Sequence, residues 1–434
     1  MRHKNINYNP SSKNNIPKSE VTEITIINVF GNRNKGDAAI VLSMIDILEK
    51  RIGAISVNIE SWHPDQDQDF YNADVFTTLW RYGISAPYIG ISPLAIYEAI
   101  RKIPLLYSIK YNLSSPLGQE YLLRDQEQEL FDRMKKSDLV LSCGGGFLHD
   151  SHGPAFLKHL YTLKMATLID TPVMIYAQSI GPFRKKHYGS LACSVLNEVD
   201  YITVRDNISE NYLEEIGVTD PPREVTADAA FLLEPTPPEN NGILRTIRES
   251  EVPIGLTVRD WKYPNSDNPK KMKKQYRKEM SKYADYLQEE LSATLFFFNH
   301  TPSDVEEAEL ITNSCDNTSE IHILDSNIPP RQLKYLTGEV ELFVGTRMHS
   351  TIFSMEMDTP TISIPYLPKS KDLMERLGLK ELFIDISQVN SRDLQVLTQN
   401  VIEDRTYQMK MSRGIDHLKS LTRRNAEIAS SMIS

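Results

Sequence analysis

Short apolar runs alternate with longer amphipathic segments along most of this chain. Residues 24–30 (ITIINVF) are followed by a loop, by the helix-like residues 38–51 (AAIVLSMIDILEKR) and by a second apolar run at 55–61 (ISVNIES). Strands that alternate with helices pair in parallel, because each helix carries the chain back to the same end of the sheet. The pattern restricts the chain to the α/β class and predicts doubly wound, Rossmann-like sheets.

The alternation stops near residue 235 and then begins again, which predicts two α/β domains. Between them, residues 234–242 (EPTPPENNG) have the proline and polar content of a linker. We assign residues 1–22 to a disordered tail, 23–235 to an N-terminal α/β domain, 236–250 to the linker and 251–390 to a C-terminal α/β domain. Residues 391–434 are expected to be helical and to reach back across the domain interface.

The composition excludes several classes of function. The chain has 434 residues, of which 40% are hydrophobic, and a formal net charge of −10. A general nucleic-acid binder needs a basic surface to neutralise phosphates, so we expect no nucleic-acid partner. Cys143, Cys193 and Cys315 are far apart in the sequence and form no C-x-x-C pair, which argues against a disulfide framework or a cysteine zinc site.

Neither an export signal nor a bilayer-spanning stretch is recognisable, so we expect a cytoplasmic protein. Residues 79–118 follow no clean period, are rich in Tyr, Ile and Leu, and carry scattered Arg and Lys. They are interpreted as an insertion in the N-terminal domain that packs on that domain, or as a lid or an interfacial surface for a lipid-linked substrate at the inner face of a membrane. The basic stretch 262–278 is interpreted as a solvated helix face.

Glycine-containing loops follow two predicted strands of the N-terminal domain. Glycine lets the backbone approach a ligand closely because it has no Cβ. For Asp37, in the first of these loops, there are two interpretations: it binds substrate, or it is the N-cap of the helix that is predicted to begin near residue 38. Neither loop matches a complete G-x-G-x-x-G or Walker A pattern, so a dinucleotide or nucleoside triphosphate is not expected. In the loops GNRNKGDAAI (31–40) and CGGGFLHD (143–150), the predicted substrate-binding residues are Asn32, Gly36, Asp37, Gly144, Gly145 and Gly146.

In the C-terminal domain, the predicted strand 342–345 leads into GTRMHS (345–350). Thr346 is the expected N-cap of the next helix, and Arg347 and His349 lie at its start. The carboxyl ends of parallel strands and neighbouring helix N-termini bind anions, so Arg347 is predicted to hold an anionic substrate. His349 is predicted to be the general acid or base, because histidine titrates near neutral pH.

Three further cations are candidates for substrate binding: Arg205, Arg259 and Lys369. For the two arginines the alternative is an ion pair with the adjacent carboxylate, Asp206 or Asp260.

Two histidines and an aspartate come shortly after the three glycines of the second loop. Their spacing could ligate a metal, but a polar loop ahead of a helix is the preferred interpretation, and we predict no required metal. The residues concerned are His149, Asp150 and His152.

Taken in order, the stretches GNRNKGDAAI, CGGGFLHD, RDNIS, TADAAF and GTRMHS, with IPYLPK after it, resemble the polysaccharide pyruvyl transferase family over roughly residues 24–385. The resemblance implies a glycosyltransferase-B-like pair of domains with the active site in the interdomain cleft. It also implies transfer of the pyruvyl group of phosphoenolpyruvate to sugar hydroxyls as a cyclic ketal, in the synthesis of exopolysaccharides, capsules or cell-wall polymers. Met348 departs from the leucine that is common in the family.

The chemistry of this donor agrees with the predicted site. Phosphoenolpyruvate carries a carboxylate and a phosphate, which require at least two cationic groups. We expect it to be the donor substrate, with no other cofactor, and a saccharide acceptor that is free, nucleotide-linked or lipid-linked. Two alternatives remain open, because a fold does not determine a function: a nucleotide-sugar-dependent glycosyltransferase of the same architecture, and a non-catalytic saccharide-binding protein.

Overall fold

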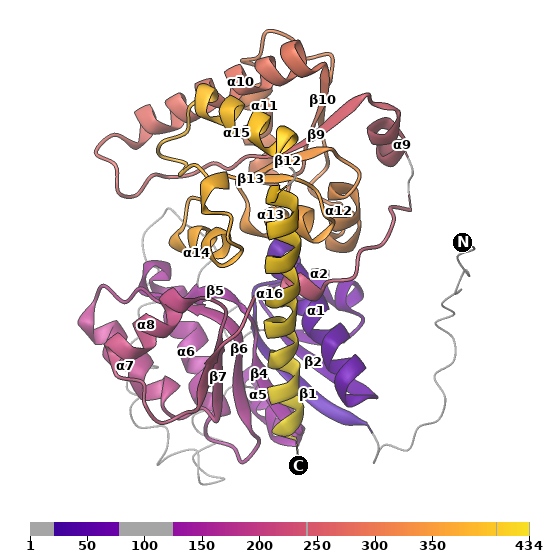
Figure 1. Ribbon diagram of the computed structural model, residues 1–434. Coiled ribbons are helices and arrows are strands. Elements are labelled where there is room, and N and C mark those ends of the chain that lie inside the picture. Colours follow the sequence, from indigo (N-terminus) through magenta and orange to yellow (C-terminus); the bar gives the residue numbers. More distant parts are fainter. Residues whose placement is uncertain (1–20, 78–124, 240–241, 405, 434) are drawn as a thin grey trace.

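The computed structural model describes residues 21–77, 125–239, 242–404 and 406–433. Within these ranges the chain forms two α/β domains stacked end to end, so the predicted fold class is confirmed (Figure 1). The insertion expected at 79–118 lies outside the described residues, as do residues 1–20 of the expected tail. Thr22, the last residue assigned to that tail, is instead the first residue of strand β1.

The N-terminal domain is built on a sheet of eight strands whose described pairings are all parallel. The order is β3-β2-β1-β4-β6-β7-β8, and β5 also pairs with β6. Every residue of the central strand β6 is buried, as expected for a parallel sheet covered on both faces. The strands are β1 (Thr22–Val29), β2 (Ile55–Ser61), β3 (Asp74–Thr77), β4 (Leu139–Ser142), β5 (Gly145–Leu148), β6 (Val173–Ile180), β7 (Tyr201–Val204) and β8 (Arg223–Val225).

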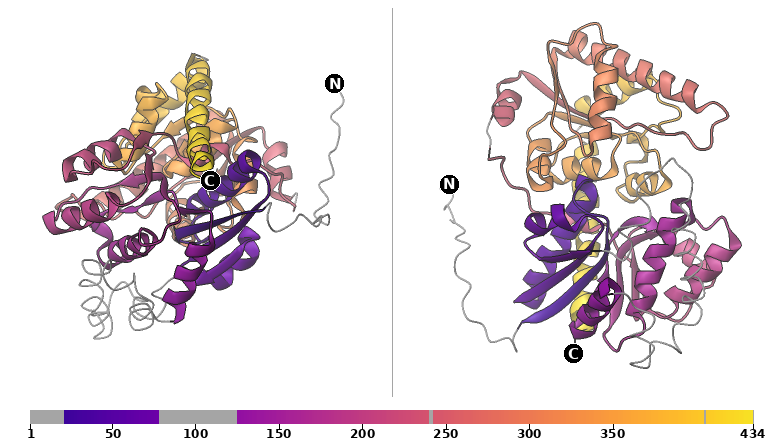
Figure 2. Two further views of the ribbon diagram at one scale, coloured as in Figure 1. Left: turned by 90° about the horizontal axis from the view of Figure 1, so that it is seen from below. Right: turned by 180° about the vertical axis from the view of Figure 1, so that it is seen from behind.

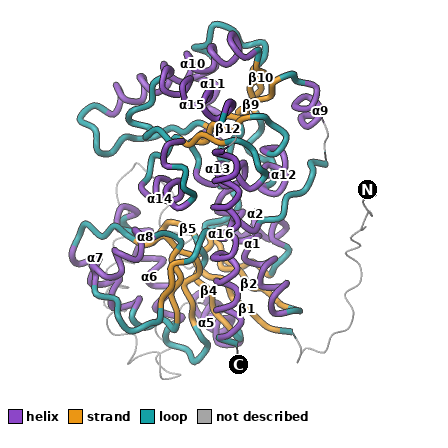
Figure 3. Tube along the Cα trace, in the orientation of Figure 1, coloured by secondary structure: helices purple, strands orange, loops and turns teal. Residues whose placement is uncertain are grey.

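Helices connect these strands. They are α1 (Lys35–Ile52), α2 (Pro64–Tyr71), α5 (Asp125–Lys136), α6 (Pro154–Ala166), α7 (Lys186–Leu196) and α8 (Asn207–Ile216), with short 3₁₀ turns η2 (Asp150–His152) and η3 (Ala229–Leu232). Figure 3 shows them on both sides of the strands. The order of the sheet reverses at β1, because β2 and β3 lie on one side of it and β4 and the later strands lie on the other.

The C-terminal domain repeats this architecture with five parallel strands in the order β11-β10-β9-β12-β13. They are β9 (Val252–Thr257), β10 (Ala293–Phe297), β11 (Ile321–Ile323), β12 (Leu342–Gly345) and β13 (Thr361–Ser363). The helices are α9 (Gly242–Glu249), α10 (Pro269–Leu291), α11 (Pro302–Thr312), α12 (Pro330–Thr337), α13 (Met348–Glu356), α14 (Pro368–Arg376), α15 (Ser391–Glu403) and α16 (Thr406–Ser431), with the 3₁₀ turn η4 (Lys380–Leu382). This sheet reverses its order at β9.

The two domains share a hydrophobic core. Apolar residues of α1 and β1 belong to the same buried cluster as Leu333 of α12 and Phe353 of α13. Helix α16 runs from the second domain along the first, where it contacts α1, η3 and β6 (Figures 1 and 2). Because this helix and the shared core join the domains, the loops that face each other across the interface are held in defined positions.

Two segments contain more structure than the sequence predicted: the range 236–250, expected to be a linker, and the range 262–278, expected to be a solvated helix face. The range 236–250, assigned to a linker, contains helix α9, which buries Leu244 and Ile247. In the basic stretch 262–278, Lys273 forms an ion pair with Asp260, and Arg277 pairs with Glu307 (2.6 Å). None of the helices in the described ranges has both the length and the apolar character needed to cross a bilayer.

Candidate active site

Most of the predicted site residues, though not Arg205 and Lys369, lie on or directly after loops that follow the strands where each sheet reverses its order. In the N-terminal domain these loops follow the neighbouring strands β1 and β4, and in the C-terminal domain they follow the neighbouring strands β9 and β12. Ligands of open α/β sheets bind at the carboxyl ends of the strands at this switch point. The topology therefore brings four loops from two domains to one candidate site.

Gly36 brings helix α1 against His349 of the other domain. A Cβ at Gly36 would overlap the imidazole ring, so this approach requires glycine. The side chain of Asn34 caps α1 by accepting a hydrogen bond from the Gly36 N–H (3.1 Å). The alternative that Asp37 caps this helix is therefore wrong. Asp37 lies in the first turn, where Oδ2 accepts a hydrogen bond from Asn34 Nδ2 (2.8 Å).

The half-buried carboxylate of Asp37 lies among the cations of the cleft. Burial acts to lower the pKa values of Lys369, Arg347 and Arg259, and the charge of Asp37 acts to raise each of them. Asp37 therefore lies close enough to cations of the second domain to influence their charge.

Arg347 is buried at the N-terminus of α13. Its guanidinium contacts Asp304 and donates a hydrogen bond to Thr301 Oγ1 (3.0 Å). Burial acts to lower the pKa of Arg347, but the charges of Asp304, Tyr366 and Asp37 and the hydrogen bond to Asp304 together raise it above its ordinary value. Arg347 is itself the N-cap residue, so the assignment of Thr346 to that position is wrong. The Thr346 N–H instead donates to Thr257 Oγ1 (2.8 Å), which fixes the turn.

Arg259 lies near Arg347 but has no ion pair with a carboxylate among the described residues. Its guanidinium lies 4.6 Å from the ring centre of Tyr366, and its Nε is buried without a hydrogen-bond partner. The pairing considered for it is wrong, because Asp260 pairs with Lys273. Burial and the charge of Arg347 lower the pKa of Arg259. A half-buried cation without a carboxylate partner is stabilised by a bound anion.

His349 lies between Gly36 and a buried carboxylate of the N-terminal domain. Its Nε2 is 3.4 Å from Asp228 Oδ2. Burial would raise the pKa of Asp228, but Arg205 and His349 hold it well below its ordinary value. An ionised carboxylate beside one ring nitrogen sets the tautomer and the orientation of a histidine. Asp228 is thus suited to position His349.

Arg205 is committed to contacts within its own domain. Its guanidinium pairs with Asp228, and its Nε donates to Ser179 Oγ (2.8 Å). The alternative of an ion pair within the domain is therefore confirmed for Arg205. Only the suggested partner is wrong, because Asp206 caps helix α8 by accepting from the Ser209 N–H (2.8 Å). Arg205 borders the site, yet most of its hydrogen-bonding capacity serves the fold.

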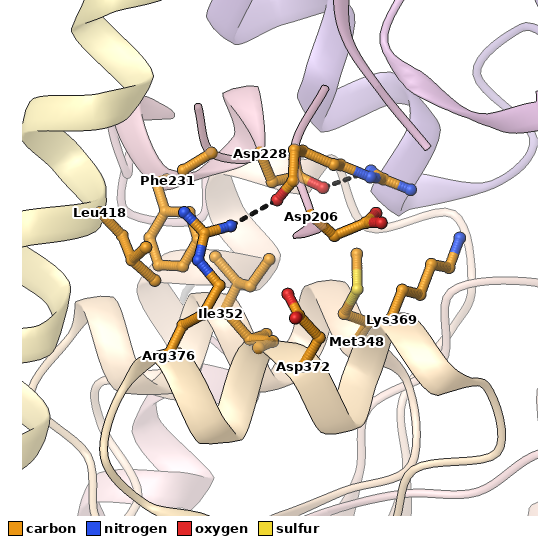
Figure 4. A pocket seen from close by; sticks show the side chains of 12 residues that line it. Asp206, Asp228, Phe231, Met348, Ile352, Lys369, Asp372, Arg376 and Leu418 are labelled. Atoms are coloured by element: carbon orange, nitrogen blue, oxygen red, sulfur yellow. Dashed lines mark hydrogen bonds and ion pairs between the residues drawn. The ribbon is translucent and has the colours of Figure 1, made fainter. Parts of the chain in front are cut away.

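Lys369 reaches across the interface from helix α14 (Figure 4). A Cβ at Gly146 would lie 2.5 Å from Lys369 Nζ and 3.3 Å from Arg205 Nη2, so glycine makes room for the ammonium group. Burial and the charge of Arg205 lower the pKa of Lys369 to about 8. The cation therefore titrates close to neutral pH.

The remaining predicted binding residues contact their own domain. Asn32 donates from its backbone N–H to Asp67 Oδ1 and from Nδ2 to the Gln66 carbonyl, both at 2.9 Å. A Cβ at Gly144 would lie 3.0 Å from the Tyr176 carbonyl of β6, and Gly145 has a φ of 141°. These contacts show how the residues shape the two loops.

The histidines after the second glycine loop do not form a ligand set. Asp150 Oδ2 accepts a hydrogen bond from the Lys185 N–H (2.8 Å), while the rings of His149 and His152 lie 4.2 Å apart. Burial lowers the pKa of His149 to about 4. Across the described ranges, no group of three or more histidine, cysteine or carboxylate side chains is arranged to hold a metal ion.

Sequence reasoning missed four residues that hold the site: Thr257, Asp228, Asp304 and Arg376. Arg376 donates to the carbonyls of Arg205 and Thr226, each at 2.6 Å, and so joins α14 to the N-terminal domain beside a cavity of about 20 Å³ (Figure 4). Its partner Thr226 is 150 residues away in sequence. Only Asp228 had a local signal, because it lies in the stretch TADAAF.

Solved structures share this two-domain, glycosyltransferase-B-like fold at low sequence identity. MnaA of S. aureus with UDP has a TM-score of 0.57 at 12% identity and covers 90% of each chain. UDP-GlcNAc 2-epimerase from Neisseria meningitidis, bound to UDP-GlcNAc, has a TM-score of 0.56 at 12% identity over 94% of this chain and 99% of that one. Alr3699/HepE of Anabaena, in complex with UDP and glucose, has a TM-score of 0.54 at 14% identity over 94% and 100%. These likenesses show the fold alone.

Sequence comparison identifies the family. The amylovoran biosynthesis protein AmsJ of Erwinia amylovora is 23% identical over 404 residues, which are 89% of this chain and 94% of that protein. A family model described as polysaccharide pyruvyl transferase matches residues 34–368, a range that contains Gly36, Arg259 and His349. Because this match spans most of the chain and the loops of both domains, the chain belongs to the polysaccharide pyruvyl transferase family.

Proposed function

We propose that this protein transfers the pyruvyl group of phosphoenolpyruvate to two hydroxyl groups of a saccharide and so forms a cyclic ketal. The observation that supports this best is a pair of arginines after β9 and β12, of which Arg347 is buried and Arg259 is half-buried. Arg347 has Asp304 as a partner, whereas Arg259 has no carboxylate partner among the described residues. A ligand with two anionic groups fits two guanidinium groups, and phosphoenolpyruvate has a carboxylate and a phosphate.

The reaction balances without an oxidant or a further cofactor. Protonation of the methylene carbon of the donor turns it into a methyl group and makes the neighbouring carbon electrophilic. One sugar hydroxyl adds to that carbon and loses its proton. The carbon–oxygen bond to phosphate then breaks, and a second hydroxyl of the same sugar adds and loses its proton, which closes the ketal and releases phosphate.

In this scheme His349 moves the proton, and Asp228 holds the imidazole in position. Arg259 and Arg347 bind the anionic groups of the donor, and Lys369 supplies a third cation from the edge of the cleft. Preorganised cations in a site of low polarity stabilise the charge that develops on the departing phosphate. Asp37 faces the same space from the N-terminal domain and is suited to orient an acceptor hydroxyl.

The acceptor we propose is a saccharide intermediate of a surface polysaccharide. AmsJ, the relative that covers most of this chain, is named for the biosynthesis of amylovoran. An acceptor that is free, nucleotide-linked or lipid-linked is compatible with the proposal. Contact of residues 79–118 with a membrane stays a prediction, because these residues lie outside the described ranges. A vesicle co-sedimentation assay with and without anionic lipid tests it.

Replacing His349 with Gln tests the proposed proton transfer. We expect phosphate release from phosphoenolpyruvate, measured with galactoside, glucoside and mannosaminide acceptors, to fall by about 10²–10⁴-fold. Donor affinity measured by calorimetry should change far less. The control is His417→Gln, which alters an exposed histidine on α16. Near-normal turnover in His349→Gln would show that this histidine is structural.

Ligand-induced stabilisation separates pyruvyl transfer from nucleotide-sugar-dependent glycosyl transfer. A ligand that binds only the folded state raises the unfolding temperature. We expect phosphoenolpyruvate to stabilise the wild type, and we expect this effect to be lost in Arg259→Ala. Stabilisation by UDP-glucose but not by phosphoenolpyruvate would contradict the proposal and support the glycosyltransferase instead.

A further inference from the structure

A cluster of aromatic rings extends from the second glycine loop (residues 143–150) to the protein surface. The ring of Phe147 lies 4.2 Å from that of His159, which stacks on Trp62 at 5.3 Å, and Trp62 lies 5.5 Å from Phe30. Phe147 follows Gly146, the residue that meets Lys369. His159 is 2% exposed and Phe30 is 43% exposed, so the cluster leads from the buried site to an open ring.

We propose that the exposed face of Phe30 is a subsite on which a sugar ring of the acceptor stacks. The inference rests on the proposed function, because it takes the acceptor to be a saccharide. The C–H groups on one face of a pyranose carry partial positive charge, and the face of an aromatic ring is negative, so the two faces attract each other as they exclude water. Among the exposed large apolar side chains of the described residues, Phe30 is the aromatic one.

The place of Phe30 in the fold supports this assignment. It directly follows β1, at the switch point of the N-terminal sheet. Five residues later, the Lys35 N–H donates to the His300 carbonyl of the second domain (3.3 Å), and the next residue, Gly36, meets His349. Six residues of fully extended chain span at most about 20 Å. An acceptor of two or three sugar units bridges such a distance, with one ring at His349 and another at Phe30.

Contacts beneath the loop hold Phe30 in a fixed position. Gly31 has a φ of 105°, and a Cβ there would lie 2.9 Å from Asp67 Oδ2. The same carboxylate accepts from the Asn32 N–H (2.9 Å) and from the Ser61 hydroxyl. A ring that is already ordered loses little entropy when a ligand stacks on it.

Polar side chains lie on the same loop as Phe30 and on the start of α2, which packs against it through His63. The His63 ring packs edge-on against Phe30 with centroids 6.4 Å apart. Arg33, three residues after Phe30, donates from Nε to Gln66 Oε1 (2.9 Å), and both side chains are exposed. Donors and acceptors beside an apolar face can bind the hydroxyl groups that point outward from a stacked pyranose.

Substituting the ring while preserving apolar area tests the proposal. Methyl β-galactoside, methyl β-glucoside, N-acetylmannosamine, lactose and cellobiose are titrated by saturation-transfer NMR against the wild type, Phe30→Leu, Phe30→Trp and Leu310→Ala. Leu310 is the matched control, because it is 45% exposed and lies on α11 of the other domain. For the saccharide that binds best, we expect Phe30→Leu to raise the dissociation constant by about tenfold and Phe30→Trp to raise it by less than about threefold. Leu310→Ala should match the wild type.

Phosphoenolpyruvate affinity is measured on the same four proteins and should be equal in all of them. Equal saccharide affinity in Phe30→Leu and the wild type would overturn the subsite, as would the absence of binding of every saccharide by the wild type. A wild type that binds saccharide through Phe30 but does not bind phosphoenolpyruvate would leave the subsite standing and contradict the proposed function. Thermal unfolding of each variant identifies any loss of affinity that comes from misfolding.

Discussion

The tetrapeptide Thr-Val-Arg-Asp occurs once in each domain, at residues 203–206 and 257–260. In each case it begins within a strand, β7 or β9, and continues into the loop that follows. The two threonines act alike. Thr203 Oγ1 accepts a hydrogen bond from the Ala177 N–H of the neighbouring strand (2.8 Å), and Thr257 Oγ1 accepts one from the Thr346 N–H after its neighbouring strand (2.8 Å). In both sheets, the buried threonine hydroxyl therefore binds the end of one strand to its neighbour in the sheet. In the first sheet the donor lies within the neighbouring strand, and in the second sheet it lies just after that strand.

The two arginines differ. Arg205 pairs with Asp228 and Ser179, while Arg259 lies over Tyr366 with its Nε unpaired. Their strands explain the contrast. β7 lies near one edge of its sheet, beside β8 and the loop that supplies Asp228, whereas β9 is the strand at which its sheet reverses order. The same four residues therefore produce a structural ion pair in one domain and an open cationic site in the other.

Arg205→Ala should have the largest effect on stability. It removes one partner of a buried ion pair whose side chains are 3% and 5% exposed. Leaving the other charge buried costs about 3–5 kcal/mol of unfolding free energy. Urea unfolding followed by circular dichroism measures this loss. The control is Arg424→Ala, since Arg424 pairs with Glu224 while 46% exposed, and such pairs contribute less than about 1 kcal/mol. Equal stability of the two variants would show that Arg205 is not structural.

Arg259→Ala should leave the fold intact and weaken donor binding. Truncating a charged contact in a desolvated site costs about 2–5 kcal/mol of binding free energy. Calorimetric titration with phosphoenolpyruvate measures the change, and Arg259→Lys should restore little of it because an ammonium group does not reproduce the guanidinium fork. Arg245→Ala is the control, because Arg245 is 76% exposed on α9. Unchanged donor affinity in Arg259→Ala would remove this residue from the site and weaken the contrast with Arg205.

Lys369 should make donor binding depend on pH. Its pKa is lowered from 10.5 to about 8, so the ammonium group that attracts an anion is lost above pH 8. We expect phosphoenolpyruvate affinity to be nearly constant below that pH and to fall by up to about tenfold per unit above it. Calorimetry between about pH 6.5 and 9.5 should show this bend in the wild type and not in Lys369→Arg, whose charge persists. The same bend in both proteins would show that Lys369 is not its cause.

Raising the pH above 8 should weaken donor binding through Lys369, but it should increase the contribution of this lysine to the stability of the fold. Between pH 8 and 10.5 the unfolded chain binds a proton that the folded protein has released. The contribution of Lys369 to the unfolding free energy therefore rises with pH across that window. A weaker affinity accompanied by an equal or higher unfolding temperature separates this titration from general alkaline unfolding.

Much of the candidate site could be found from the sequence, because the residues that bring charge to it follow recognisable strands. The predicted Arg347 and His349 do lie at the start of α13, and Arg259 follows β9. The helix caps were predicted less well. Asn34 rather than Asp37 caps α1, and Arg347 rather than Thr346 caps α13. Several residues near a boundary can each serve as a cap, and the choice depends on which N–H groups already have tertiary partners.

The sequence by itself determined the α/β class, the presence of two domains, the family and most of the loops that meet at the candidate site. These follow from local periodicity and from motifs that read along the chain. Tertiary structure decided which of two identical tetrapeptides carries an arginine that has no carboxylate partner among the described residues, and which carboxylate lies beside His349. Arg205 and Asp228 follow the neighbouring strands β7 and β8 and neutralise each other, whereas Arg259 meets no such partner in the part of the chain that the structure describes. The sequence shows which side chains are charged. Whether each charge is compensated depends on whether the order of the strands brings an oppositely charged side chain within a few ångströms of it.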